Sequence, residues 1–383
     1  MADREPDPET RSELSARIAP GIGDFAPAEW DALAGDGDPF LTHAFLYALE
    51  QSGSVGPGTG WDPLPIVVDR GTTPVAVAPA YVKRHSQGEY VFDHGWADAW
   101  QRAGGEYYPK LQIAVPFTPV PGRRLLGHEP QALLSAIESI TRDNNLSSAH
   151  ATFLTDVDVA HCAARRWLIR DGIQYHWFNR DYATFEDFLA AMSSRKRKSV
   201  RKERATAQAG LRIESLTGSA IRPEHWDAMW DYYQDTGARK WGRPYLTRGF
   251  FDLLGAHMAD RVLLVLAFRD DTIVAGALNL IGADTLYGRY WGASEDLPFL
   301  HFELCYYQAI DWAIAHGLAC VQAGAQGEHK LARGYEPIIT RSAHFLPNPG
   351  FRNAVADFVE AERAAIANEI TAMRADLPFR ATD

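Results

Sequence analysis

The sequence predicts an α+β protein made of two successive units of the same kind, each a mixed and mostly antiparallel sheet flanked by helices. Three observations lead to this prediction. The chain has 383 residues, more than one hydrophobic core usually contains. The pattern P-x-x-W-D-A occurs at residues 27–32 and again at 223–228, and R-x-x-T-x-V-A occurs at 70–76 and 269–275. The two pairs have nearly the same offset, which indicates an internal duplication.

Each repeated pattern fits a definite structural element. The P-x-x-W-D-A segments suit the first turn of an amphipathic helix, with proline early and tryptophan facing the core. The R-x-x-T segments are polar turns between runs of β-branched residues, which predicts hairpins at residues 64–81 and 262–281. Short matches of this kind also occur by chance, but the order of the following elements is the same in both halves.

The elements after each hairpin are an aromatic strand, an amphipathic helix and an apolar strand. They are expected at residues 90–96, 129–142 and 149–154 in the first half, and at 286–291, 299–316 and 319–323 in the second. A last amphipathic helix is predicted at 351–373. The expected division is therefore a first unit at 15–185, a basic helix at 186–210, a second unit at 211–348 and a C-terminal helix at 349–376.

Composition limits the classes of protein that fit the chain. Hydrophobic residues make up 46% and charged residues 23%, as in ordinary globular proteins, and the net charge of −11 argues against indiscriminate nucleic-acid binding. The sequence has no apolar run of about 20 residues and an acidic, polar N-terminus, so we expect a cytoplasmic protein. Cys162, Cys305 and Cys320 are expected to be core residues, and no spacing predicts a metal site.

Five sequence blocks carry a resemblance to a known family. They are Y-P-K-L-Q-I-A-V-P-F-T-P-V at 108–120 with G-R-R at 122–124, S-R-K-R-K at 194–198, Y-W-G at 290–292, H-F-E-L-C-Y-Y at 301–307 and G-A-Q-G-E-H-K at 324–330. The chain resembles the Fem-type aminoacyltransferases of the GNAT superfamily, and more closely their proteobacterial relatives in peptidoglycan biosynthesis and recognition. The resemblance implies two tandem GNAT-type domains and transfer of an acyl or aminoacyl group to an amine.

Amide-forming transfer sets the requirements for catalytic residues. It needs an activated acyl donor, a neutral amine and hydrogen-bond donors for the oxyanion, and the resemblance places such donors at the splayed centre of the sheet, just before the central helices. His301 and Glu303 begin the second central helix, where either could accept the amine proton, although Glu303 could equally be a favourable first-turn acid. Residues 327–335 resemble a Fem-type segment with an active-site lysine. By that match Lys330 would stabilise negative charge with support from Arg333, unless it is a structural surface lysine.

Two basic segments are candidates for binding phosphates of the acyl donor. Gly122, Arg123 and Arg124 precede the first central helix and could hold phosphate, or form a solvated structural loop. The run with Arg195, Lys196, Arg197 and Lys198 has only Met192 and Val200 as apolar contacts, and could bind tRNA or form a solvated linker helix. Residues 294–301 lack the glycine pair of acetyl-CoA loops. Aminoacyl-tRNA or acyl-CoA is therefore expected as co-substrate, with no tightly bound cofactor.

Aromatic and hydrogen-bonding residues are candidates for binding a peptide or sugar acceptor, or simply cover the sheet. They are Asp93, His94, Trp96 and Tyr108 in the first unit, and Tyr290, Trp291 and Arg333 in the second. We expect an N-acyltransferase of cell-envelope or peptide-conjugate biosynthesis, with the acceptor bound mainly by the first unit and chemistry in the second. The alternative is a non-catalytic protein that recognises peptidoglycan or a glycopeptide. The sequence gives no indication of oligomeric state.

Overall fold

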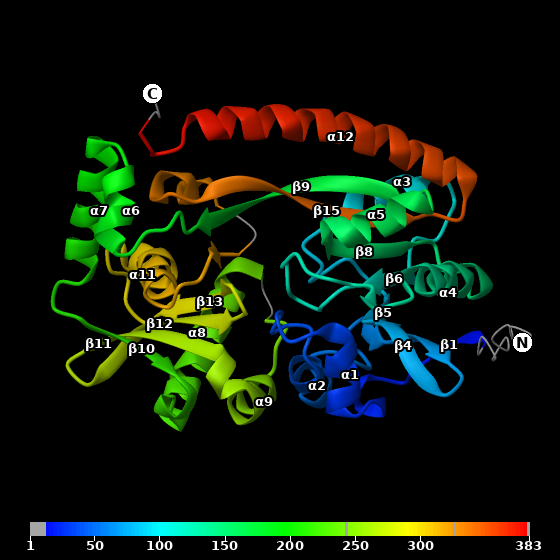
Figure 1. Ribbon diagram of the computed structural model, residues 1–383, viewed down its shortest axis with the longest axis horizontal. Helices are drawn as coiled ribbons and strands as arrows, with labels where there is room; N and C mark the ends of the chain where they lie inside the picture. The colour runs from blue at the N-terminus through cyan, green and yellow to red at the C-terminus, as the bar shows by residue number, and fades with distance from the viewer. Residues whose placement is uncertain (1–12, 242–243, 325–326, 381–383) are drawn as a thin grey trace, which may run out of the picture.

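The computed structural model describes residues 13–241, 244–324 and 327–380. Its strands form two sheets flanked by helices (Figure 1). The small sheet has the order β1 (Leu14–Ile18), β3 (Ile66–Arg70), β4 (Thr73–Ala78), β7 (Leu126–Gly127). The large sheet has eleven strands in the order β10 (Arg212–Thr217), β11 (Val262–Arg269), β12 (Thr272–Ile281), β13 (Thr285–Ala293), β14 (Cys320–Gln322), β9 (Leu168–Phe178), β15 (Glu336–Phe345), β8 (Ala149–Leu154), β6 (Lys110–Ile113), β5 (Ala80–Lys83), β2 (Trp61–Pro63).

The helices coincide with the amphipathic segments of the sequence, and several of them begin at a capping residue or at a proline. Thr42 and Thr155 cap α2 and α5, Thr184 forms a capping box at α6, and proline opens four helices. The α-helices are α1 (Pro27–Ala34), α2 (His43–Gln51), α3 (His94–Arg102), α4 (Pro130–Asp143), α5 (Asp156–Ala164), α6 (Phe185–Ala191), α7 (Ser194–Ala207), α8 (Pro223–Trp241), α9 (Arg248–Met258), α10 (Leu300–Phe302), α11 (Gln308–Ala315), α12 (Pro349–Ala375). None of the helices within these described ranges is long and apolar enough to cross a membrane.

The last strand of each half lies in the sheet beside the other half. β9 pairs with β14, β15 pairs with β8, and β9 and β15 pair with each other along nine residues, all antiparallel. The only parallel pairs in the described part of the large sheet are β6 with β8 and β13 with β14. The α+β class with mixed, mostly antiparallel sheets is thus confirmed. The division of the chain at 186–210 stays a prediction, because strands of both halves share one sheet.

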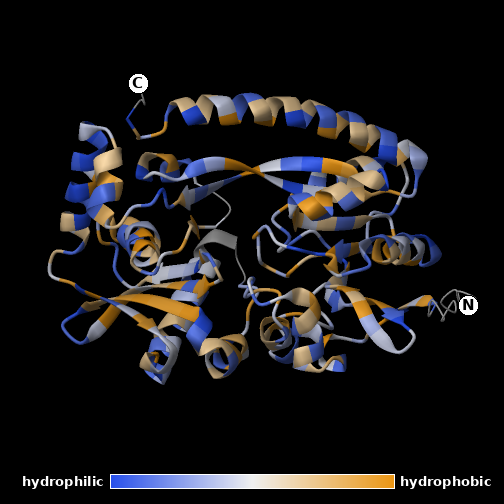
Figure 2. Cartoon of the chain, viewed as in Figure 1, coloured by the Kyte–Doolittle hydropathy of each residue, from blue (hydrophilic) through white to orange (hydrophobic). Residues whose placement is uncertain are grey.

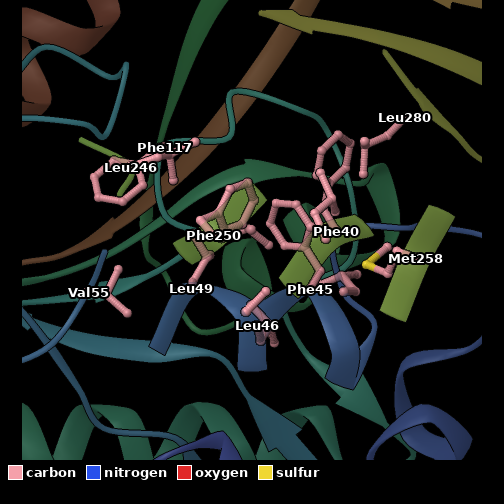
Figure 3. Packing of buried hydrophobic residues seen from close by; sticks show 14 of the residues in the cluster. Phe40, Phe45, Leu46, Leu49, Val55, Phe117, Leu246, Phe250, Met258 and Leu280 are labelled. Atoms are coloured by element: carbon pink, nitrogen blue, oxygen red, sulfur yellow. The ribbon is translucent and has the colours of Figure 1, made fainter. Parts of the chain in front are cut away.

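One hydrophobic cluster joins the two halves below the large sheet. Figure 3 shows Phe40, Phe45 and Leu49 packed against Phe250 and Leu280, which come from the second half. The strands that supply this cluster are strongly hydrophobic, whereas α7 carries many hydrophilic residues (Figure 2). The shared core therefore fixes the first half against β12 and α9, and it positions the cavity described below.

The expected aromatic strand at 90–96 is wrong. Residues 90–93 form no strand, and α3 begins at His94. The strand between β5 and β8 is instead β6. Asp93 is 3% exposed and accepts hydrogen bonds from Lys110 and Tyr107, so a buried ion pair holds this segment out of the sheet. The single basic helix expected at 186–210 is two helices, α6 and α7, which are separated by extended backbone at residues 192–193. The other predicted hairpins, helices and strands are present with small shifts of their ends.

Candidate functional site

A cavity of about 340 Å³ opens where the parallel strands β13 and β14 diverge. The two strands pair only from Thr285 opposite Cys320 to Tyr287 opposite Gln322. Beyond these pairs, Gly288 on one strand and Ala323 and Gly324 on the other line the cavity. Separation of two parallel strands leaves main-chain groups without their ladder partners, and such groups can bind a ligand.

A β-bulge shapes the β13 side of this cavity. Leu278 lies opposite Tyr290 and Asn279 lies opposite Gly288, so Arg289 is an extra residue on β13. A bulge bends its strand and changes the direction of nearby side chains. Arg289, Tyr290 and Trp291 all line the cavity as a result.

Both halves of the chain contribute aromatic rings to the cavity. Phe117 from the first half stacks on Tyr245 with the ring centroids 4.8 Å apart. His301 lies at the start of the central helix, with ring centroids 5.0 Å from Trp291 and 5.3 Å from Tyr306. The remaining aromatic lining residues are Tyr90, Tyr233, Tyr290 and His329. Three sequence candidates, Tyr290, Trp291 and His301, therefore meet here.

Lys330 lies directly behind one wall of the cavity. It belongs to a 3-10 helix (Glu328–Arg333), its side chain is 1% exposed, and its Nζ donates to the carbonyl oxygen of Gly324 at 2.8 Å. Among the described residues no carboxylate is within ion-pair distance of it. Burial removes water from the ammonium group and lowers the pKa of Lys330 to about 8. The structure thus excludes a surface lysine and places a buried amine with a lowered pKa beside Gly324.

Glu303 does not line the cavity, which contradicts its expected role as proton acceptor. It begins a π-helical segment (Glu303–Tyr307) and is fully buried. Its carboxylate accepts hydrogen bonds from Arg204, Gln208 and Gln308. These bonds attach α7 to the central helix, so Glu303 has a structural role.

Arg333 is also occupied by contacts within the protein. It pairs with Glu203 of α7 at 2.9 Å, and its guanidinium lies 3.4 Å from the ring centroid of Phe302. Tyr307 donates to the same carboxylate at 2.5 Å. Arg333 is not among the residues that line the cavity, so the structure does not place it beside this candidate site. It holds α7 close to the segment that carries Lys330.

The basic run forms the first turns of α7. Met192 and Val200 are buried, as predicted. Arg201 pairs with Glu186, whereas Arg195, Lys196, Arg197 and Lys198 have no ion pair with any described acid. Figure 1 shows α7 at the edge of the molecule, next to α6. Four cations are thus available to a ligand on this helix.

The loop with Gly122, Arg123 and Arg124 is not a phosphate cradle. Arg124 is 1% exposed and donates to the carbonyl oxygens of Val120, Thr152 and Arg123. Arg123 donates to two further carbonyl oxygens, and the N–H of Gly122 donates to the carbonyl oxygen of Phe153. The side chains of both arginines therefore donate hydrogen bonds to backbone carbonyl oxygens of the protein.

The first-half acceptor candidates lie away from the cavity. Asp93 belongs to the buried ion pair with Lys110, Trp96 packs against His344, and the hydroxyl of Tyr108 bonds to Ser86. His94 is exposed and stacks on Phe92. The first half instead supplies Tyr90, Phe117 and Pro119 to the cavity.

Most of the lining residues were not singled out from the sequence, and three of them carry polar or thiol groups of interest. Asn279 and Arg289 line the cavity, and so does Cys305, which was expected in the core. Asn279 had a signal, because it is the single polar side chain in the apolar run 273–281. Cys162, Cys305 and Cys320 form no disulfide bond within the part of the chain that the structure describes, which also contains no cluster of three potential metal ligands.

The overall fold of the chain is similar to that of several known structures. The crystal structure of FemX aligns with a TM-score of 0.52 and 13% identity over 87% of this chain and 98% of that chain. A conserved protein of unknown function from Bacteroides thetaiotaomicron VPI-5482 aligns with a TM-score of 0.53 and 13% identity over 84% and 98%. L-PGS from Bacillus licheniformis aligns with a TM-score of 0.50 and 10% identity over 85% and 98%.

The family follows from the sequence model that matches this chain. A model described as FemAB-like, peptidoglycan biosynthesis/recognition, matches residues 21–381. The protein belongs to this FemAB-like family. No curated protein matches the chain.

Proposed function

We propose that this protein is an acyl- or aminoacyltransferase that forms an amide on an amine bound in the cavity between β13 and β14. The observation that carries the proposal is the open cavity at a splayed strand pair, with Lys330 buried behind its wall at Gly324. The family's description supports a peptidoglycan peptide or related conjugate as acceptor. We propose that the protein acts in the cytoplasm.

The proposed reaction joins the amine to an ester or thioester. The amine nitrogen attacks the carbonyl carbon, a C–N bond forms, and the C–O bond of an aminoacyl-tRNA or the C–S bond of an acyl-CoA breaks. The amine proton passes to His301, which lines the cavity, and the leaving oxygen or sulfur takes up a proton. The charge of Lys330 acts through the low-dielectric wall at Gly324 to stabilise the oxyanion, so Lys330 is a positioning and electrostatic residue.

A phosphate-rich donor is supported by α7. Arg195, Lys196, Arg197 and Lys198 are unpaired in the described part of a chain with a net charge of −11. Concentrated cations of this kind bind nucleic-acid phosphates. The contacts of Glu203 and Arg204 connect α7 to the segments of Lys330 and the central helix. We therefore propose aminoacyl-tRNA as the donor, and a duplication as the origin of the two halves.

The test measures transfer of a radiolabelled acyl group from a charged tRNA pool, and separately from acetyl-CoA, to peptidoglycan precursor peptides. Lys330→Met is expected to lower kcat at least about 100-fold, a loss typical of removing one group that stabilises an oxyanion. Neutralising the four α7 cations to glutamine should raise KM for tRNA about 10-fold or more and reduce its salt dependence, without affecting acetyl-CoA.

Arg84→Gln is the matched control for charge, because Arg84 is exposed and pairs with Asp62 in the first half. It should leave both donors unaffected. Transfer from acetyl-CoA alone would contradict the choice of tRNA. Binding of the peptides without transfer from either donor would contradict the enzyme and favour a recognition protein.

A further inference from the structure

Asn279 and Arg289 line the cavity, and each has one side-chain atom without a hydrogen-bond partner in the described structure. Asn279 is 1% exposed, and its Nδ2 donates to the carbonyl oxygen of Leu263 at 3.3 Å, which leaves Oδ1 unpaired. Arg289 donates from Nη2 to the carbonyl oxygen of Phe117 at 2.5 Å, while its buried Nε has no partner. Unpaired buried polar atoms are rare in folded proteins and indicate a missing ligand or water.

The charge of Arg289 is also uncompensated. No described carboxylate lies within ion-pair distance of it, and neither Asp nor Glu is among the residues that line the cavity. The guanidinium carbon lies 5.5 Å from the ring centroid of Phe40 and 5.6 Å from that of Tyr290. Aromatic faces stabilise a cation only in part, and buried charges are usually paired. An anionic group of a ligand would complete this environment.

The strand pairing brings the acceptor atom and the cation close together. Asn279 lies opposite Gly288, and Arg289 is the next residue along β13. A Cβ atom placed on Gly288 would lie 3.4 Å from Oδ1 of Asn279, so this oxygen lies over bare backbone at the point where the strands separate. The wall of the cavity thus holds an unpaired, solvent-inaccessible acceptor and a cation on neighbouring positions.

We propose that the cavity binds an α-amino acid unit, with its carboxylate on Arg289 and an N–H group on Oδ1 of Asn279. This inference rests on the proposed function and deepens it by naming the class of acceptor: an amine that also bears a carboxylate. The planar guanidinium suits the planar carboxylate. A volume of about 340 Å³ is at the lower end of small-molecule sites, which fits one or two residues of a ligand.

Binding is measured without any donor, so the outcome is independent of turnover. The melting temperature of the full-length protein is recorded with each of the twenty L-amino acids, and with the corresponding amino-acid amides and desamino acids. At least one amino acid should raise the melting temperature, and its amide should not. Calorimetry on that amino acid should show at least about 30-fold weaker binding by Arg289→Gln. Asn279→Leu should remove the preference of the site for the amino acid over its desamino acid.

Arg269→Gln is the matched control, because Arg269 pairs with Glu295 on the surface and lies outside the cavity. It should bind as tightly as the unmodified protein. The proposal is overturned if no carboxylate binds, if amides bind equally well, or if Arg289→Gln retains binding. It is also overturned if inorganic phosphate or pyrophosphate binds through Arg289 more tightly than every carboxylate, since the anion would then belong to the donor. If the binding holds but no transfer is found, only the proposed reaction fails.

Discussion

The two pairs of parallel strands in the large sheet have the same pairing, but one pair separates around an open cavity and the space beside the other is filled. Between β13 and β14 the strands separate around an open cavity lined by aromatic rings. Between β6 and β8 the corresponding space is filled, because Gly122 pairs with the end of β8 at Leu154 and Arg124 donates to the carbonyl oxygen of Thr152. The difference indicates that one half of the chain has an open cavity at its parallel junction, while the other half closes its junction with its own side chains.

The closed junction is held by a buried arginine, and the largest expected effect follows from removing it. Arg124→Ala would leave three carbonyl oxygens without their donor and would remove one of the two cations, Arg124 and Arg123, near the buried carboxylate of Asp158. We expect a loss of about 3–5 kcal/mol in the free energy of unfolding, measured by urea denaturation. The neighbouring Arg123→Ala should cost less than about 1 kcal/mol, because its side chain is exposed.

The comparison between the junctions would fail if Arg124→Ala kept its stability and instead lost affinity for tRNA or acyl-CoA. In that case the first junction would be a phosphate site, as the sequence suggested. Equal losses in the free energy of unfolding for the Arg123 and Arg124 variants would also contradict the comparison, because only Arg124 is expected to stabilise the filled junction.

Burial of Lys330 beside the open junction lowers the free energy of unfolding, and substitution of this lysine measures by how much. Because its pKa lies near 8 instead of 10.5, burial of Lys330 disfavours the folded state by up to about 3 kcal/mol below pH 8. Between pH 8 and 10.5 the unfolded chain holds a proton that the folded chain lacks, so stability contributed at this site rises with pH. Lys330→Met should therefore raise the free energy of unfolding by about 1–3 kcal/mol at pH 7. The same variant should lose transfer activity.

The measurement is denaturant unfolding at pH 7 and at pH 10. The gain from Lys330→Met should shrink at pH 10, where the folded lysine is neutral and the pH approaches the unfolded pKa of 10.5. Lys202→Met is the control, since Lys202 is exposed on α7 and should show no such pH dependence. A Lys330→Met protein that is less stable at pH 7 would show that the lysine is a structural residue.

Local patterns predicted the elements, whereas distant partners decided the roles of polar residues. Leu133, Leu134 and Ile137 on α4 are fully buried and Ile140 is partly buried, which fits the amphipathic helix predicted at 129–142. Glu303 was assigned from its place at a helix start, but its partner Arg204 lies 99 residues earlier in the chain. Spacing along the sequence contains no information on such a contact. The cavity itself depends on how two strands from one half meet loops from the other, which no local pattern records.

The smallest expected effect concerns the polar network beside the closed junction. His150 on β8 and His344 on β15 face each other with their Nδ1 atoms 2.6 Å apart, and both rings are buried. Burial lowers the pKa of His150 to about 3 and lowers that of His344 further below its usual range. Lys110 and Arg170 lower both pKa values, and Asp93 raises them. The folded state therefore keeps both rings neutral well below pH 6.

The unfolded chain protonates these histidines near pH 6.5, so it binds more protons than the folded chain between about pH 6 and pH 3. Stability is then lost as the pH falls, by about 1.4 kcal/mol per pH unit for each buried histidine. His344→Asn should reduce this slope by about that amount in urea unfolding between pH 6 and pH 4, whereas His94→Asn, on the exposed face of α3, should leave it unchanged. Equal slopes for both variants would mean that the closed junction does not hold its histidines neutral, and that acid sensitivity arises elsewhere in the molecule.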